Sequence, residues 1–387
     1  MIDFGGTYRA VSPIQTLARI EPMLWSVFGI SRVANITGLD HIDLPTYIAI
    51  RPQAKLLTTS QGKGITHDLA KTSAIMESIE GWHCENMGEP DLFGSYDTLR
   101  NRFPMVDLHS NMNHGPFEWV DIETLEIPWA KGLELHTGRE IYVPYTTINV
   151  NTAFYREGYR YFPPNTNGLA SGNTLEEAIC HGLLEVLERE FHAVHHAIFK
   201  MPCIDLNTIR SPYLLDLLEK IKRSNLSLLV LDMSTEMQIP AYLVFIHDFN
   251  NIRTVGKHIG SGAHISSVVA LSRAITEAIQ SRATSISGSR DDFTPRIYQK
   301  NQSLSNKFSQ IFESKHNAQI PFVETAVPKD FQSCIHSLLS ILKQHGFNQV
   351  IVYNHTREII DIPVVHVLVP GLRYIGGTCF SCSLSPI

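Results

Sequence analysis

The sequence has no excess of positive charge. Its 32 lysine and arginine residues are outnumbered by 38 aspartate and glutamate residues, so the formal net charge is -6. Proteins that bind nucleic acid nonspecifically neutralise phosphates with a basic surface. The composition argues against that class, and we expect no nucleic acid among the partners of this protein.

Long apolar runs and a secretory signal are also missing. The longest apolar stretches, such as residues 228–231 and 241–246, are far too short to span a bilayer. The first residues do not have the basic and then apolar layout of a signal peptide. Six cysteines in 387 residues do not make a disulfide framework. These absences predict a cytoplasmic protein that does not enter a membrane.

One cysteine pair has a suggestive spacing, since Cys379 and Cys382 stand three residues apart near the C-terminus. A structural zinc site needs four ligands, and no second pair with this spacing exists. Two ordinary thiols are favoured over a redox or sulfur-handling pair.

Periodicity and turn residues predict an α+β protein. Helices are expected at 15–28, 68–86, 174–199, 266–285 and 331–345. Strands are expected at 44–51, 127–135, 140–150, 226–231, 241–247, 254–260, 349–354 and 363–369. Residues 88–118 are expected to be mostly irregular, and 299–319 a mobile loop. Three times a glycine-bearing loop, at 60–64, 165–173 and 260–264, precedes a long helix. The pattern predicts layered sheets and long helices around one composite cleft.

Two of these helices carry paired glutamates. Glu77 and Glu80 stand three residues apart, and so do Glu185 and Glu188. Residues i and i+3 share a helical face, so each pair offers two carboxylates to one region. A single pair of this kind is more often a solvated acidic surface. Here apolar residues surround both pairs, and buried carboxylates need partners such as Mg²⁺.

The third long helix adds positive charge. Arg273, Glu277 and Gln280 fall on one helical stripe, with Arg282 close by. They form either a surface ion pair or an arginine held by Glu277 against phosphate oxygens, for which the planar guanidinium is suited. The residues of this helix alone favour neither alternative over the other.

The glycine-bearing loops are expected to present backbone N–H groups to an anion at helix N-termini. None of them matches the P-loop or the dinucleotide-binding pattern. Asn173 and Thr174 are suited to cap the second long helix. His192 and His196 have no further ligand that completes a metal site, so a plain amphipathic helix end is favoured.

Taken together, these segments resemble the YcaO family. The likeness covers residues 8–372, and its three motifs occur in order in the stretches 61–80, 167–189 and 262–282. The resemblance implies a YcaO-like fold over residues 1–387 as a single domain, with sub-layers at 1–150, 151–260 and 261–387. It also implies an ATP site in which carboxylates from two helices hold Mg²⁺ against the triphosphate.

The resemblance assigns roles to individual residues. The implied metal ligands are Glu77, Glu80, Glu185 and Glu188. The implied nucleotide and phosphate contacts are Arg9, Thr16, Lys63, Asn173, Glu177, Arg189, Arg273, Glu277, Gln280 and Arg282. This chain departs from many relatives at Gly81, where they have arginine, and from some at Ala170, where they have a hydroxyl residue.

The implied activity is ATP- and Mg²⁺-dependent activation of peptide backbone amides. The product is a thioamide if external sulfide attacks the amide, and an azoline if a Cys, Ser or Thr side chain attacks it. The N-terminal segment 8–20 and the lack of a proline-rich ending are typical of relatives that work with a TfuA-type partner, which favours the thioamide. We therefore expect a peptide substrate and a TfuA-like or leader-peptide-binding partner, and a homodimer is one assembly that the sequence allows. A non-catalytic scaffold is the alternative from another class.

Overall fold

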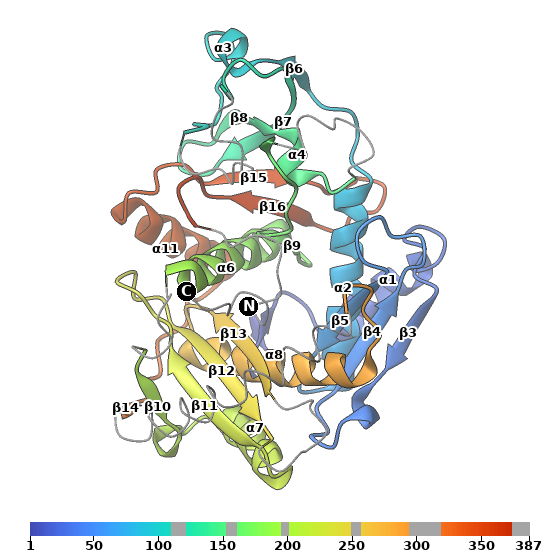
Figure 1. Ribbon diagram of the computed structural model, residues 1–387, viewed down its shortest axis with the longest axis vertical. Coiled ribbons are helices and arrows are strands. Elements are labelled where there is room, and N and C mark those ends of the chain that lie inside the picture. The colour runs from blue at the N-terminus through green and yellow to red at the C-terminus, as the bar shows by residue number, and fades with distance from the viewer. Residues whose placement is uncertain (110–120, 152–160, 195–200, 249–256, 294–318, 374–387) are drawn as a thin grey trace.

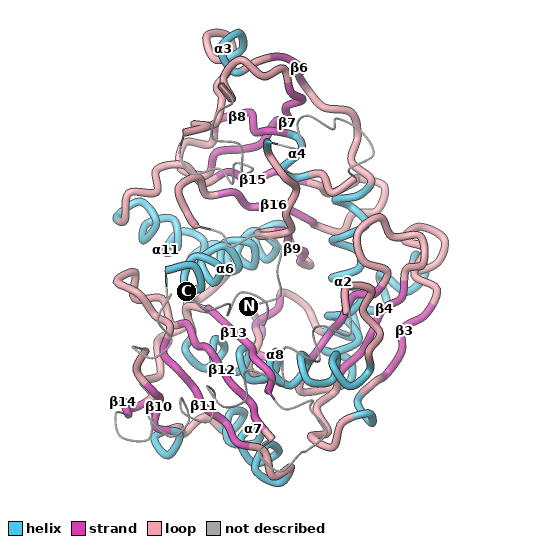
Figure 2. Tube along the Cα trace, in the orientation of Figure 1, coloured by secondary structure: helices cyan, strands magenta, loops and turns pink. Residues whose placement is uncertain are grey.

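The computed structural model describes residues 1–109, 121–151, 161–194, 201–248, 257–293 and 319–373. The described chain forms several separate β-sheets, with long helices packed against them (Figures 1 and 2). A short hairpin at the N-terminus pairs β1 (Ile2–Asp3) with β2 (Tyr8–Arg9).

A three-stranded antiparallel sheet follows near the N-terminus. Its strand order is β3 (Arg32–Asn35), β4 (Thr46–Ile50) and β5 (Thr59–Lys63). Helix α2 (His67–Glu85) packs against this sheet and against α1 (Pro13–Ile20). Thr66 caps α2, because its side chain accepts a hydrogen bond from the Leu69 N–H.

A five-stranded sheet forms the second layer. Its order is β13 (Lys257–Ala263), β12 (Ala241–His247), β11 (Ser227–Asp232), β10 (Cys203–Asp205) and β14 (Gln319–Pro321). Helix α8 (Ser267–Ser287) packs on β13 and β12, and α7 (Pro212–Arg223) lies beside α8. Every residue of β12 is buried, as expected for a strand that pairs with another strand on both sides.

The third layer joins distant parts of the chain. Its order is β6 (Leu92–Gly94), β7 (Ile127–Glu134), β15 (Ile351–Asn354), β16 (Val364–Leu368) and β9 (Leu169–Ser171), and β8 (Arg139–Pro144) also pairs with β7. Helix α6 (Leu175–Val194) packs on β16 and β9, and α11 (Phe331–Gln344) packs on α6. The short helices are α3 (Tyr96–Leu99) and α4 (Tyr145–Ile148). This sheet therefore contains strands from each of the three expected sub-layers.

The prediction of a glycine-bearing loop before each long helix is wrong for the first and third segments and confirmed in part for the second, where only 169–171 form a strand. Residues 59–63 form β5 and residues 257–263 form β13, while the middle segment contains β9. The glycines permit close packing rather than a loop. A Cβ on Gly62 would lie 2.0 Å from the backbone nitrogen of Ala74 in α2, and one on Gly260 would lie 2.2 Å from that of Ala278 in α8. Glycine in a strand is typical where another backbone approaches closely.

Three other boundaries differ from the sequence prediction for local reasons. The first helix ends at Ile20 instead of residue 28, and a 3-10 turn containing Pro22 follows, since proline is excluded from a helix interior. Strand β8 ends at Pro144 and α4 follows it. Within 88–118, β6 and α3 are regular, and 110–118 lie outside the described residues. The expected mobile loop also lies outside them, except for Gln319 in β14.

Candidate functional site

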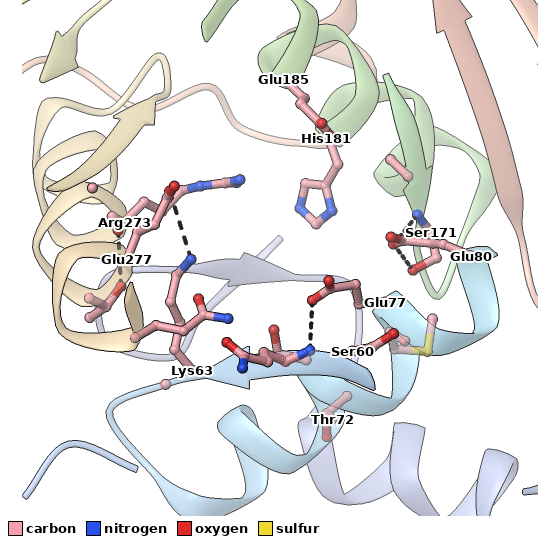
Figure 3. Close-up of a pocket in the computed structure, with 18 of the residues that line it drawn as sticks. Ser60, Lys63, Thr72, Glu77, Glu80, Ser171, His181, Glu185, Arg273 and Glu277 are labelled. Carbon is pink, nitrogen blue, oxygen red and sulfur yellow. Dashed lines mark hydrogen bonds and ion pairs between the residues drawn. The ribbon is translucent and has the colours of Figure 1, made fainter. Parts of the chain in front are cut away.

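A cavity of about 860 Å³ lies where α2, α6 and α8 meet strands β5, β9 and β13 (Figure 3). Its volume is within the range of small-molecule sites. Every residue that the sequence analysis assigned to the nucleotide or the metal lines this cavity, except Arg282. These residues are Arg9, Thr16, Lys63, Glu77, Glu80, Asn173, Glu177, Glu185, Glu188, Arg189, Arg273, Glu277 and Gln280.

The α2 carboxylates enter the cavity from one side (Figure 3). Glu80 is half-buried, and its Oε1 accepts hydrogen bonds from the Ser171 backbone N–H at 2.9 Å and from the Ser171 hydroxyl at 2.6 Å. Glu77 reaches the water of the cleft and accepts a bond from the Gln61 N–H at 3.2 Å. Strands β9 and β5 thereby orient the two side chains.

The α6 carboxylates enter from the opposite helix. Glu188 is buried and accepts hydrogen bonds from the Ser261 hydroxyl at 2.6 Å and the Ala263 N–H at 3.2 Å. Glu185, one turn earlier, has its Oε1 3.9 Å from an Arg189 nitrogen. Because Glu77 and Glu80 of α2 and Glu185 and Glu188 of α6 all line the same cavity, these four carboxylates converge there.

Burial and like charge disfavour ionisation of this group. Burial in the cleft raises the pKa of Glu80 to about 8, and the nearby Glu77 and Glu185 add to the rise. Burial also raises the pKa of Glu185 to about 7, and the protein that surrounds Glu77 raises its pKa to about 7 by desolvation although the side chain is open to the cleft. Glu188 differs, since Arg189 and Arg273 outweigh the effect of its burial and hold its pKa below the usual value. For three of the four carboxylates, the positive charge of the protein itself is therefore too small to favour the ionised form.

Cationic side chains stand on the other side of the cavity, on α8 and β5. Lys63 Nζ lies 3.9 Å from Glu277 Oε2, whereas both alternatives drawn from the sequence pair Glu277 with Arg273. Arg273 points into the cavity without an ion pair to Glu277 among the described residues (Figure 3). Lys63 and Arg273 thus both face the carboxylates, and Glu277 lies between them along the wall.

The N-terminal segment closes one end of the cavity. Buried Glu177 accepts hydrogen bonds from the backbone N–H groups of Ala10 and Asn173, both at 3.1 Å, and its Oε1 is 3.8 Å from Arg9 Nε. The Thr16 hydroxyl donates to Asn173 Oδ1 at 2.7 Å. Glu177 and Asn173 therefore position Arg9 and Thr16. Helix α6 is capped by Thr174, which accepts from the Glu177 N–H, and Asn173 is left for these contacts.

Arg282 is placed elsewhere. Its Nε donates to both carboxylate oxygens of Asp40, at 3.1 and 3.0 Å, and both side chains are buried. On α8 it lies outside the cavity lining, because residues 273, 277 and 280 occupy the cavity-facing stripe. Its assignment as a nucleotide contact does not agree with this position, and a role in anchoring α8 to the 37–40 turn fits instead.

Replacing Arg282 with methionine should therefore destabilise the protein without changing nucleotide binding. The variant leaves Asp40 buried without its partner, which costs about 3 kcal/mol of unfolding free energy. Denaturant unfolding measures this loss, and the KM for ATP of the folded variant should match the wild type. A raised KM with unchanged stability would return Arg282 to the nucleotide site.

Comparison with known proteins identifies the family. A family model described as YcaO cyclodehydratase, ATP- and Mg²⁺-binding, matches residues 61–373. The chain belongs to the YcaO family. The sequence prediction of this family is confirmed, and so is the prediction of ATP and Mg²⁺ as the cofactors that its members bind.

Relatives extend this match to most of the chain. A protein encoded in the tfuA 3′ region of Rhizobium leguminosarum bv. trifolii is 36% identical over 378 residues, covering 94% of this chain and 88% of that protein. A Methanothermobacter thermautotrophicus protein is 30% identical over 94% of this chain and 95% of its own length. The Escherichia coli ribosomal protein S12 methylthiotransferase accessory factor YcaO is 24% identical, covering 84% of this chain and 59% of that protein.

Solved structures share the fold. The YcaO protein from Methanopyrus kandleri, bound with AMPPCP and Mg²⁺, superimposes with a TM-score of 0.72 at 22% identity, covering 96% of this chain and 94% of the other. A heterocyclase in complex with substrate and cofactor gives a TM-score of 0.77 at 23% identity, covering 95% of this chain and 53% of the other. The predicted YcaO-like α+β fold is confirmed. No helix in the described ranges is both long and apolar enough to cross a membrane.

The residues of this YcaO protein fit Mg²⁺. Carboxylate oxygens are the ligands that Mg²⁺ prefers, and phosphate oxygens and water take its remaining positions. The raised pKa values of Glu77, Glu80 and Glu185 indicate carboxylates that need a cation to be ionised together. The hydroxyls of Ser171 and Ser261 donate hydrogen bonds to Glu80 and Glu188 and so orient these carboxylates for a cation.

This arrangement predicts a pH dependence of stability when Mg²⁺ is absent. The folded pKa of Glu80, about 8, lies above its usual 4.5, so the folded protein binds the proton more tightly than the unfolded chain. Stability is then full below about pH 4.5 and falls as the pH rises toward about 8. Glu80→Gln stays neutral and removes this contribution.

The matching measurement is the melting temperature of both proteins in EDTA across that pH range. The wild type should fall relative to Glu80→Gln as the pH rises, and Mg²⁺ with ADP should reverse the trend for the wild type alone. Parallel curves for the two proteins would contradict the raised pKa of Glu80.

Several site residues were not predicted from the sequence. Ser171 precedes Gly172 at the end of β9, and Ser261 lies between Gly260 and Gly262 of β13; this proximity to glycine is the signal that could have indicated them. His181 Nε2 lies 2.6 Å from Arg9 Nη1. Burial, together with the charges of Arg9 and Arg273, lowers the pKa of His181 well below the usual value. Arg51 pairs with buried Glu85, and one of its nitrogens is 3.1 Å from where a Cβ of residue 81 would lie. Arg51 thus occupies the space that Gly81 leaves.

Proposed function

We propose that this YcaO protein activates backbone amides of a peptide by phosphorylating the amide oxygen with ATP. The observation that carries the proposal is the convergence of four carboxylates from α2 and α6 on one cavity, opposite Arg273 and Lys63. A site of this charge pattern suits a metal-bound polyphosphate. An amide oxygen is a poor leaving group. Transfer of a phosphoryl group to this oxygen supplies the driving force that attack of a nucleophile on the amide alone lacks.

The side chains divide the work of binding and orientation. Mg²⁺ and ATP, when bound, supply the phosphoryl group and neutralise its charge. Glu77, Glu80, Glu185 and Glu188 would hold the cations, with Ser171 and Ser261 fixing two of the carboxylates. Arg273, Lys63, Arg9 and Arg189 would contact phosphate oxygens, and Gln280 and Thr16 line the same cavity. The chain thereby lowers the barrier through position and charge.

We assign the product as a thioamide. Sulfide adds to the amide carbon, the oxygen of the adduct accepts the γ-phosphoryl group, and phosphate leaves as the C=S bond forms. The relative from the tfuA 3′ region, at 36% identity, supports this choice together with the N-terminal segment that resembles TfuA-associated members. Azoline formation is the second candidate, favoured by the cyclodehydratase description of the family model and by the heterocyclase that shares the fold.

We further propose the setting in which the reaction occurs. The chain would act as one domain on a ribosomally made peptide or protein in the cytoplasm, together with a TfuA-like or leader-peptide-binding partner. A chain of the Escherichia coli microcin synthetase McbBCD complex with pro-MccB17 bound shares the fold with a TM-score of 0.68, which supports the proposal of a partner protein. A homodimer of this chain remains a prediction.

Mass spectrometry of the natural peptide separates the candidate reactions. With partner, ATP, Mg²⁺ and sulfide present, we expect a gain of about 16 mass units as sulfur replaces oxygen, whereas cyclodehydration would lose about 18 as water. Glu219→Gln, on the exposed face of α7, serves as the active control. A water loss that persists without sulfide would replace the thioamide by the azoline, and an unchanged mass under every condition would leave a peptide-binding scaffold.

A further inference from the structure

A second cluster of ligand atoms lies away from the nucleotide cavity. Cys84, His355 and His366 each place one ligand atom within 4.8 Å of those of the other two, and all three side chains are buried. Cys84 is in the last turn of α2, His355 follows β15, and His366 is in β16. None of them lines the nucleotide cavity. The cluster is therefore a separate feature of the fold.

Each histidine of the cluster has one buried ring nitrogen without a hydrogen-bond partner among the described residues. These atoms are His355 Nε2 and His366 Nδ1, and the two side chains are 7% and 0% exposed. A buried polar atom without a partner costs about 1–3 kcal/mol. Two such atoms beside a thiol destabilise the fold unless one ligand binds both of them.

The second contact of His366 is the one that a metal ligand usually makes. Its Nε2 lies 3.0 Å from the Asn167 carbonyl oxygen, to which it donates in the neutral ring. That bond leaves the Nδ1 lone pair free for coordination. Metal-binding histidines commonly donate their other ring N–H to a backbone carbonyl, which fixes the tautomer and the ring orientation.

We propose that Cys84, His355 and His366 bind a zinc ion through three protein ligands. One thiolate and two imidazoles are ligands that suit Zn²⁺, and a water molecule completes the tetrahedron. Zinc bonds of about 2.0–2.3 Å bring such ligand atoms within about 4 Å of one another, so small side-chain rotations close the site. On binding, the thiol proton is released, and the Sγ–Zn bond replaces the 2.8 Å hydrogen bond from the thiol to the Ile148 carbonyl.

The site would join the end of α2 to the six-stranded sheet. Glu80 precedes Cys84 by one helical turn and bonds to Ser171 in β9, and β9 pairs with β16, which carries His366. Zinc would thus add a second link between α2 and this sheet, beside the one from Glu80 to Ser171. The inference does not rest on the proposed amide activation, because it requires only metal binding and its effect on stability.

Zinc content of the full-length chain tests the site. The purified protein is treated with chelator, incubated with zinc sulfate, dialysed and analysed for metal. We expect about one zinc ion per chain for the wild type, a melting temperature raised by zinc, and a loss of at least about 90% of the bound zinc in Cys84→Ser and in His366→Asn. Cys203→Ala, which changes another buried cysteine, should keep its zinc.

X-ray absorption at the zinc edge of the wild type decides the outcome even if the variants do not fold. One sulfur and two imidazole ligands are expected. Absence of bound zinc, two or more sulfur ligands, or full zinc retention in Cys84→Ser would each overturn the proposal. The same readouts are independent of ATP and peptide, so failure of the proposed function would leave them unchanged.

Discussion

Glu185→Gln should lower ATP-dependent turnover by a factor of about 100 to 1,000, the scale for losing one strong electrostatic contact to a transition state. Glutamine keeps the size of the side chain but removes the negative charge that would bind Mg²⁺. Glu185 is partly open to the cleft and its pKa is raised to about 7, so its charge depends on a bound cation. Peptide-dependent phosphate release at saturating ATP measures the effect.

Glu219→Gln is the matched control for this change. Glu219 is an exposed helical glutamate with an arginine four residues later, as Glu185 has, but it lies on α7 away from the cavity. Its variant should keep the wild-type rate. The assignment of Glu185 as a metal ligand fails if both variants turn over equally fast. Loss of a ligand weakens Mg²⁺ binding, so excess Mg²⁺ should improve ATP binding by Glu185→Gln, and unaltered binding would also contradict the assignment.

Gly62→Ala should disrupt the site by separating strand β5 from helix α2. The added Cβ would lie 2.0 Å from Ala74 N and 2.2 Å from Ala70 O, both backbone atoms of α2. Neither atom is able to rotate away, so strand β5 and helix α2 must separate. We expect a loss of about 3 kcal/mol in unfolding free energy and, because Glu77 and Glu80 move with α2, a loss of turnover of about a hundredfold in the folded protein.

Gly88→Ala provides the comparison, since a Cβ at Gly88 would meet nothing within 4 Å. Its stability and turnover should stay close to those of the wild type. Denaturant unfolding and the peptide-dependent ATPase rate are measured on both variants. A Gly62→Ala protein as stable as Gly88→Ala would show that close packing of β5 on α2 is not required.

The sequence predicted the long helices well because their periodicity is local. The helices predicted at 68–86, 266–285 and 331–345 correspond to α2, α8 and α11 with shifts of one or two residues. The paired glutamates on α2 and α6 could be predicted for the same reason, since spacing along a helix fixes a shared face. Strands β12, β15 and β16 were likewise evident from β-branched residues.

What depended on distant contacts could not be predicted. Gly62 and Gly260 indicate a loop when only their neighbours in sequence are considered, whereas the reason for them is the helix backbone packed against each strand. Arg282 shares α8 with Arg273, but only the fold shows that Asp40 lies beside it. The cluster of Cys84, His355 and His366 forms because α2 meets β16, which no local pattern reveals.

The central claim is that the amide oxygen of the peptide leaves as phosphate. The most direct measurement uses a peptide labelled with ¹⁸O at its backbone carbonyls, incubated with this protein, partner, ATP, Mg²⁺ and sulfide, followed by mass analysis of the released phosphate. We expect ¹⁸O in the phosphate, in proportion to the modified peptide, and its loss with Glu185→Gln. Phosphate that carries oxygen from solvent water and none from the peptide would contradict amide activation.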